Sequence, residues 1–169
     1  MKTKLFVLFS FIAIAVFMTE QASAFELYSK DFKNGGYIPP LFSCLGKDIS
    51  PELHWKNPPK DTKSFVLIVE DLDAPGGVFY HWSVYDIPSS VHELKEGTKE
   101  YLQGLNDFGN IGYGGPCPPP GKPHRYYFNL YALNISSLGL PKGATIKAIQ
   151  EKIRSHILGS AFLFGLFKR

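Results

Sequence analysis

The sequence lacks a strong excess of charge of either sign. Its 169 residues include 18 Lys and Arg against 15 Asp and Glu, a net charge of only +3, and no basic cluster occurs along the chain. Proteins that bind the phosphate backbone of nucleic acids carry such clusters on one face or along a helix. The sequence therefore predicts no nucleic-acid partner.

A hydrophobic run long enough to cross a membrane is also missing. The main apolar stretch, residues 5–18, is shorter than the roughly 20 residues that a spanning helix needs. It follows two lysines and precedes small residues at 22–24, the plan of a secretory signal peptide cleaved after Ala24. A single membrane anchor is the alternative. We expect residues 1–24 to be a signal peptide and residues 25–169 to be one exported domain, periplasmic or secreted, that is not an integral membrane protein.

Cysteine is rare, because Cys44 and Cys117 are the only two in the chain. An exported chain meets an oxidising compartment, where two thiols tend to pair. Two separate buried thiols are the alternative. We expect a disulfide that joins an early segment to the Gly- and Pro-rich segment around Cys117.

Motifs that demand catalysis are absent. The chain has no phosphate-cradling P-loop and no serine in a nucleophile-elbow motif. Several side chains could act as bases, but nothing in the sequence requires turnover. The sequence therefore predicts a protein that is not an enzyme, with no catalytic residue, no metal and no cofactor.

Aromatic residues, proline and glycine are abundant, and they indicate a β-rich body with many turns. Apolar and β-branched runs predict strands at 65–70, 81–87 and 126–133, with weaker candidates at 25–28 and 53–55. The first run is apolar almost throughout, as expected of a central strand that is buried on both faces.

One helix is predicted, over about residues 145–158. Thr145 can cap its start and Gly159 its end. The apolar residues that share one face of this helix are Ile146, Ile149, Ile153 and Ile157. The helix should therefore pack on the sheet through this face.

Asp71 and Asp73 follow the first predicted strand and precede a turn that contains Pro75. Their spacing points both carboxylates the same way if the strand continues, and the hairpin returns His81 close to them. A carboxylate beside an imidazole fixes its tautomer and raises its pKa. Taken alone, the segment is explained more simply as a polar turn with side-chain to backbone bonds.

A second loop, residues 112–123, is rich in glycine and proline and ends at His124 and Arg125. Free N–H groups of its glycines could form a nest for an anion. Strand alternation sends His124 and Arg125 to opposite faces, so that one lines a pocket while the other braces the loop. A rigid loop with a structural histidine is the alternative, but two such loops in one small domain favour a joint pocket for an anionic group.

The same residues could be read as a metal site. Asp71, His81 and His124 would then support a metal-assisted hydrolase. The Gly- and Pro-rich walls and the lack of a histidine pair at ligand spacing favour anion binding instead.

Long motifs of this chain resemble the phosphatidylethanolamine-binding protein family. Residues 71–75 (DLDAP) with 81–88 (HWSVYDIP) resemble its first signature, and residues 112–126 (GYGGPCPPPGKPHRY) its second. The similarity is to the bacterial and archaeal, Raf kinase inhibitor-like branch. Shorter matches lie at 38–39, 50–55, 143–144 and 158–161, so the resemblance covers essentially the whole mature chain.

This resemblance implies a mainly β fold, with a large antiparallel sheet, a smaller sheet and a few peripheral helices. It also implies a pocket for phosphate-like groups, including a phospholipid head group. The ligand-binding residues carried over from the family motifs are Asp71, His81, Gly115, Pro116, His124 and Tyr126, while Asp73 and Pro75 shape the loop. Leu72 stands where the family commonly has proline, which affects how Asp71 is aimed.

We therefore predict non-catalytic binding of a small anionic or phosphorylated ligand. The alternatives are an interaction or inhibitor protein that modulates a kinase or protease partner, and a metal-assisted hydrolase. The apolar segment 162–167 is expected to be either core or a surface for a partner or lipid. Asn134 would accept a glycan only in a eukaryotic secretory path.

Overall fold

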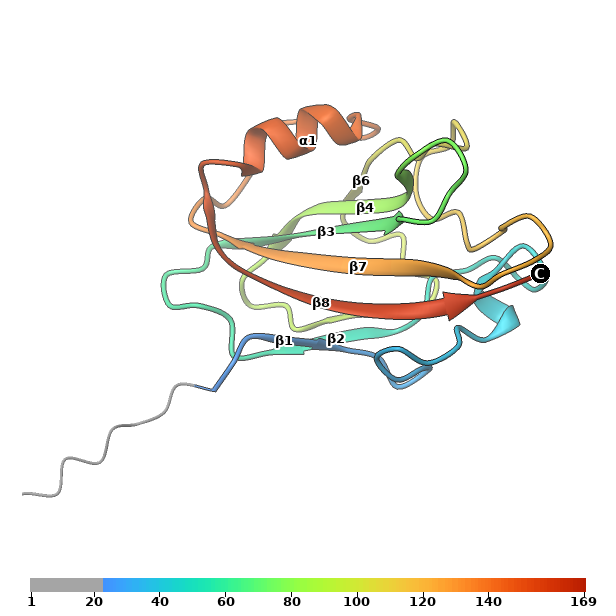
Figure 1. Cartoon of the computed structure of the whole chain (residues 1–169). Helices are drawn as coiled ribbons and strands as arrows, with labels where there is room; N and C mark the ends of the chain where they lie inside the picture. The colour runs from blue at the N-terminus through green and yellow to red at the C-terminus, as the bar shows by residue number, and fades with distance from the viewer. Residues whose placement is uncertain (1–22) are drawn as a thin grey trace, which may run out of the picture.

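The computed structural model describes residues 23–169, and its strands form two antiparallel sheets (Figure 1). The predicted signal peptide falls almost entirely outside these residues. The smaller sheet has the order β1-β2-β5, built from Glu26–Tyr28, Leu53–Lys56 and Glu93–Leu94. The larger sheet has the order β6-β4-β3-β7-β8, built from Leu102–Gln103, Phe79–Pro88, Ser64–Asp71, His124–Leu133 and Ile157–Phe167.

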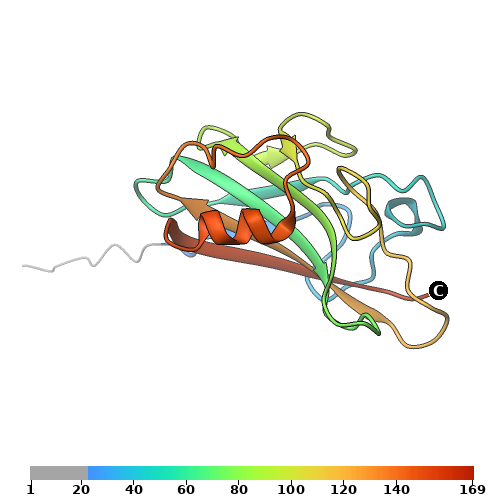
Figure 2. The same cartoon turned by 90° about the horizontal axis from the view of Figure 1, so that it is seen from above.

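The larger sheet is covered on both faces, and β3 shows why. Its side chains alternate between two buried clusters. Leu67 and Val69 pack toward the smaller sheet, whereas Val66 and Ile68 pack on the side of the helix α1, Ile146–Ile153. Figures 1 and 2 show the helix on one face and β1 and β2 on the other. The predicted central strand is therefore confirmed, together with the mainly β fold.

The predicted helix is correct at its start and wrong at its end. Thr145 caps α1, since its hydroxyl accepts a hydrogen bond from the Ala148 N–H at 3.3 Å. The helix ends at Ile153, and Ile157 is 40 % exposed at the first position of β8. The isoleucine spacing continues past the end of the helix, but pairing with β7 fixes residues 157–167 as a strand, and Gly159 lies inside it.

β8 is a strand that the sequence did not predict. It pairs along its length with β7, and its side chains alternate between the core and the surface. Leu163 and Phe167 are buried, whereas Phe162 is 57 % exposed. The apolar segment 162–167 is therefore partly core and partly surface.

The site is positioned by the end of β3 and the starts of β4 and β7. Asp71, the last residue of β3, lies opposite Phe79 of β4 and Tyr126 of β7. The antiparallel register thus brings both sequence motifs to one end of the larger sheet. None of the helices in residues 23–169 is long and apolar enough to cross a membrane.

Candidate functional site

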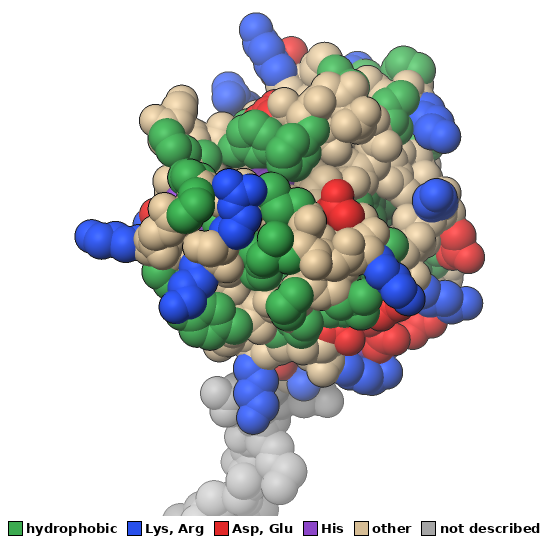
Figure 3. Space-filling model, turned by 90° about the vertical axis from the view of Figure 1, so that its right-hand side faces the viewer, with side chains coloured by type: hydrophobic (Ala, Val, Ile, Leu, Met, Phe, Trp, Pro, Cys, Tyr) green, Lys and Arg blue, Asp and Glu red, His purple; other side chains and the backbone are tan. Residues whose placement is uncertain are grey.

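A cavity of about 180 Å³ opens at this end of the larger sheet. We call it the Asp71 cavity. Its walls come from the β3–β4 hairpin, the start of β7 and the two loops that contain Phe108 and Cys117. The lining residues are Asp71, Ala74, Pro75, Phe79, His81, Phe108, Cys117, Pro118, Pro119, His124 and Tyr126. Figure 3 views this end of the molecule, where histidine shows only as small areas among hydrophobic side chains, with Lys and Arg nearby.

Asp71 is 3 % exposed, and both of its carboxylate oxygens accept hydrogen bonds. Oδ1 accepts the Asp73 backbone N–H at 2.8 Å, and Oδ2 accepts from Nδ1 of His124 at 2.7 Å. This hydrogen bond holds the orientation of the His124 ring. The second ring nitrogen, Nε2, takes no part in the bond to Asp71. The expected pairing of this carboxylate with an imidazole occurs, but the partner is His124 rather than His81.

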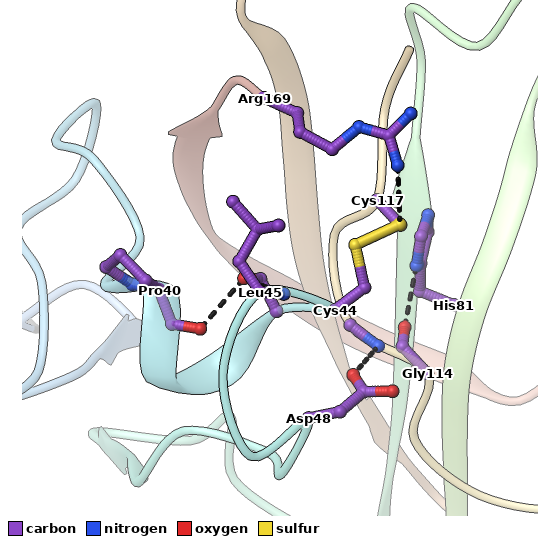
Figure 4. Close-up of a disulfide and its surroundings, with 10 residues drawn as sticks. Pro40, Cys44, Leu45, Asp48, His81, Gly114, Cys117 and Arg169 are labelled. Carbon is purple, nitrogen blue, oxygen red and sulfur yellow. Dashed lines mark hydrogen bonds between the residues drawn. A yellow bond between two sulfur atoms is a disulfide. The ribbon is translucent and has the colours of Figure 1, made fainter. Parts of the chain in front are cut away.

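His81 is held by a different group. Its Nδ1 donates to the Gly114 carbonyl oxygen at 2.7 Å, because a carbonyl can only accept, and the ring is 3 % exposed (Figure 4). Nε2 makes no hydrogen bond within residues 23–169. Burial lowers the pKa of His81, against smaller raising effects of the Gly114 carbonyl and the Asp71 charge. The neighbouring carboxylate of Asp71 raises this pKa as expected, but desolvation is the larger effect, so the net shift of the His81 pKa is downward.

The Tyr126 hydroxyl makes no hydrogen bond of ordinary geometry in the described part of the chain, although the residue is only 1 % exposed. Buried polar atoms usually have a partner, so an orphan hydroxyl beside a cavity needs an explanation. Burial raises the pKa of Tyr126, and the Asp71 carboxylate raises it further, through its charge and as an acceptor within reach of the hydroxyl. The hydroxyl therefore keeps its proton and can donate a hydrogen bond.

Arg125 braces the loop from the opposite face of β7, as strand alternation predicts. Its Nε and one terminal nitrogen donate to the two carboxylate oxygens of Asp73 at 2.9 and 2.7 Å, and its backbone N–H donates to the same carboxylate at 2.8 Å. Hydrogen bonds from Arg125 lower the pKa of Asp73 to about 2. Asp73 and Arg125 thus shape the loop without lining the cavity.

Two predicted ligand residues, Gly115 and Pro116, do not line the cavity. The Gly115 N–H donates to Oδ1 of Asp48 at 2.6 Å, the Gly114 N–H to the His81 carbonyl at 3.0 Å, and the Gly112 N–H to the Gly104 carbonyl at 3.1 Å. These amides are used inside the protein, so the predicted glycine nest is wrong. A Cβ on residue 115 would collide with the Phe42 carbonyl, so this glycine serves close backbone packing instead.

The predicted disulfide between Cys44 and Cys117 is present and closes a sequence separation of 73 residues (Figure 4). Cys117 lines the Asp71 cavity, while Cys44 belongs to the loop that also carries Asp48. The Cys44 N–H donates to the Pro116 carbonyl at 3.2 Å. The bridge therefore ties one wall of the cavity to an early segment of the chain.

Sequence reasoning missed the aromatic part of the cavity. Phe79 and Phe108 lie with ring centroids 4.7 Å apart, and Phe108 lies 5.4 Å from the His81 ring. Phe79 precedes His81 by two residues on β4, so the period of a strand could have placed both on one face. Phe108 sits in an irregular loop where no periodic signal exists.

The described residues 23–169 contain no group of three or more His, Cys, Asp or Glu side chains arranged to hold a metal ion. Asp71 and His124 form a pair, and His81 turns one nitrogen to a carbonyl. The arrangement lends no support to the metal-assisted hydrolase alternative.

Comparisons with known proteins agree with this fold. The family model for phosphatidylethanolamine-binding protein matches residues 28–168. A UPF0098 protein of Aquifex aeolicus is 52 % identical over 151 residues, which cover 85 % of this chain and 88 % of that protein. A crystal structure of a phosphatidylethanolamine-binding protein homologue from Chlamydia trachomatis superimposes with a TM-score of 0.82 at 41 % identity, covering 86 % of this chain and 98 % of that one. The structure of YbcL from Escherichia coli gives a TM-score of 0.82 at 32 % identity, covering 87 % and 99 %.

Proposed function

The chain belongs to the phosphatidylethanolamine-binding protein family, and on that premise we propose that it binds small phosphate-type anions in the Asp71 cavity without catalysing their turnover. The observation that carries the proposal is the buried Tyr126 hydroxyl, which belongs to a residue lining the cavity and makes no hydrogen bond of ordinary geometry, with only the Asp71 carboxylate within reach. An anion oxygen is a strong acceptor for such a donor.

The carboxylate of Asp71 can lie beside a bound anion because two hydrogen-bond donors already offset its negative charge. Two donors, the Asp73 N–H and the His124 ring, occupy its oxygens. In the protonated state of His124, the Asp–His pair is neutral overall, and Nε2–H of the ring is a free donor. Asp71 is therefore a positioning residue, Tyr126 and His124 are the hydrogen-bond donors to the ligand, and His81 lines the same cavity beside them.

The surroundings of the cavity suit a phosphate that carries an apolar chain. Leu72 is 40 %, Val78 48 % and Phe108 46 % exposed. Leu72 and Val78 are neighbours of lining residues, and Phe108 is one itself. A phospholipid head group, as the name of the family suggests, would place its phosphate inside and its chains across these residues. A kinase or protease partner that contacts the same rim is the second candidate.

The proposal is tested by titration calorimetry with inorganic phosphate and with phosphorylethanolamine. The Tyr126→Phe variant should bind both about ten- to hundredfold more weakly, because a hydrogen bond to a charged group is lost. Its free energy of unfolding should change little, since the wild-type hydroxyl makes no hydrogen bond of ordinary geometry. Tyr131→Phe, on the same strand, is the matched control and should bind like the wild type.

Equal affinities of Tyr126→Phe and the wild type would overturn the proposal. Vesicles with and without phosphatidylethanolamine separate a lipid ligand from a soluble one. Prolonged incubation with phosphorylethanolamine should release no inorganic phosphate.

The proposed setting of this function is outside the cytoplasm. Residues 1–24 have the plan of a signal peptide, and the paired cysteines suit an oxidising compartment. Expression of the full chain in a bacterial host should yield an exported protein that begins at Phe25, which intact-mass analysis of the exported fraction would detect. A protein that retains residues 1–24 would contradict the proposal.

A further inference from the structure

A second and larger cavity, of about 470 Å³, shares no lining residue with the Asp71 cavity. We call it the Ser50 cavity. Four segments that are distant in the sequence converge around it. Its lining residues are Lys47, Asp48, Ile49, Ser50, Gly97, Thr98, Lys99, Tyr101, Gln103, Ile111, Gly112, Tyr113 and Lys142.

Hydrogen bonds within and between these segments hold the walls in place. The Gly97 N–H donates to the Ser50 carbonyl at 2.9 Å, and the Gln103 side chain donates to the Thr98 carbonyl at 3.2 Å. The Gly143 N–H, next to Lys142, donates to the Gln103 carbonyl at 2.8 Å. These bonds fix the backbone of three of the four segments relative to one another.

The charge of the cavity is positive. Lys47, Lys99 and Lys142 line it, and none of them forms an ion pair within residues 23–169. Asp48 is the one acidic lining residue, and its Oδ1 accepts the Gly115 N–H at 2.6 Å. Three ammonium groups against one carboxylate leave two positive charges, which match a dianion.

A buried hydroxyl in the wall lacks a partner. Ser50 is 2 % exposed, and its Oγ makes no hydrogen bond in the described part of the chain. An unsatisfied buried polar group is costly, so a ligand oxygen at this position would remove the cost. The unpartnered Ser50 hydroxyl and the three lysines are separate indications of a ligand, because a missing hydrogen-bond partner does not depend on surface charge.

We propose that the Ser50 cavity is a second binding site, which takes an organic phosphate dianion. The phosphate group is bound by the Ser50 hydroxyl and the three lysines. The organic part lies against the apolar lining residues Ile49, Tyr101 and Ile111. The volume, more than twice that of the Asp71 cavity, has room for a ring beside the phosphate.

Phenyl phosphate is the probe, because it combines one ring with one dianionic group. In an NMR titration it should shift the amide signals of Gly97, Lys99, Tyr101 and Gly112. The dissociation constant fitted to these signals should differ from the one fitted to the signals of Phe79 and Cys117 in the Asp71 cavity. Inorganic phosphate should bind the Ser50 cavity more weakly than phenyl phosphate does. Shifts confined to Phe79 and Cys117 would overturn the proposal.

Two variants test the contacts. Replacement of Lys47, Lys99 and Lys142 together by Gln should weaken binding at the Ser50 cavity by about tenfold or more. The matched control replaces the exposed residues Lys60, Lys63 and Lys152, which lie outside the cavity, and should leave this affinity within about twofold. An unchanged affinity in the first variant would contradict the proposal.

Ser50→Ala separates a ligand contact from a structural role. It should weaken phenyl phosphate binding at the Ser50 cavity without lowering the free energy of unfolding, since the wild-type hydroxyl has no partner to lose. A variant that unfolds more easily yet binds phenyl phosphate as tightly as the wild type would show that Ser50 is structural only.

Discussion

Nδ1 of His124 lies 2.7 Å from Oδ2 of Asp71, which joins two residues 53 positions apart in the sequence. The pair exists because β3 and β7 run antiparallel with Asp71 opposite Tyr126, so that the end of one strand meets the start of the other. The carboxylate thereby aims a ring nitrogen at the cavity, and the orientation of the ring depends on the register of the sheet.

Asp71→Asn should weaken binding of sulfate, a ligand of fixed charge, rather than strengthen it. The Asp71 carboxylate accepts hydrogen bonds from two donors, one at each oxygen, whereas the amide of Asn has only one acceptor oxygen. The variant therefore loses the bond to the Asp73 N–H or the bond to His124. We expect about a tenfold loss of affinity in calorimetry at constant pH. If Asp71 acted only by repelling the anion, the variant would bind more tightly.

The ion pair between Arg125 and Asp73 should make stability depend on pH in the acid range. The pKa of Asp73 is about 2 in the folded protein, below the value of about 3.9 for an unfolded chain. The stabilisation is therefore present above about pH 4 and is lost as the pH falls toward about 2. Arg125→Gln should lower the free energy of unfolding in urea at pH 6, and the difference from the wild type should shrink near pH 2.

The effect of Arg125 should be small, because its side chain is 48 % exposed. Lys122→Gln is the control, since Lys122 forms no ion pair within residues 23–169 and its loss should give no such pH dependence. A difference between Arg125→Gln and the wild type that stays constant from pH 6 to pH 2 would contradict the role of Asp73.

The strands of the core could be predicted from local pattern, and the contacts between strands could not. β3 is apolar on both faces because it is covered on both, which a single segment already reveals. The Asp71–His124 pair depends on which strand lies beside β3. Local reasoning instead chose His81, the histidine nearest along the chain, and the structure turns that ring to the Gly114 carbonyl.

The errors at the C-terminal end and in the Gly-rich loop have similar causes. Ile157 extends the helical spacing of α1 by chance, and only the pairing of β8 with β7 shows that the helix has ended. The Gly115 N–H was expected to be free for an anion. Its acceptor, Asp48, lies 67 residues away. The predicted disulfide already brings that segment to the loop, but nothing in the sequence marks Asp48 as the acceptor.

Removal of the disulfide should lower stability substantially. Replacement of Cys44 and Cys117 by Ser removes a crosslink between residues 73 positions apart. In the chain-entropy model, the loss of this crosslink lowers the free energy of unfolding by about 4 kcal/mol. Urea unfolding of the double variant would measure this loss. Because Cys117 lines the Asp71 cavity, phosphate binding should also weaken. The unreduced, unfolded wild type should show no titratable thiol, and two free thiols would contradict the bridge.

Binding of sulfate in the Asp71 cavity should be accompanied by uptake of a proton by the protein. Burial lowers the pKa of His81, so the free protein holds this ring neutral, with Nδ1–H donated to Gly114 and a lone pair on Nε2. A lone pair facing an anion is repulsive, and sulfate carries no proton at neutral pH. The bound anion therefore raises the pKa of His81, and affinity should fall as the pH rises, by up to about tenfold per pH unit for one linked proton.

Calorimetry at pH 7 in two buffers with different ionisation enthalpies measures this uptake directly. The wild type should take up a substantial fraction of one proton, and His81→Gln, whose amide can still donate to the Gly114 carbonyl, should take up markedly less. His156→Gln is the matched control, because His156 bonds Asn134 beyond the far end of β7 and should leave the uptake unchanged. Uptake that persists in His81→Gln would place the proton on another group, and absence of uptake in the wild type would contradict the prediction.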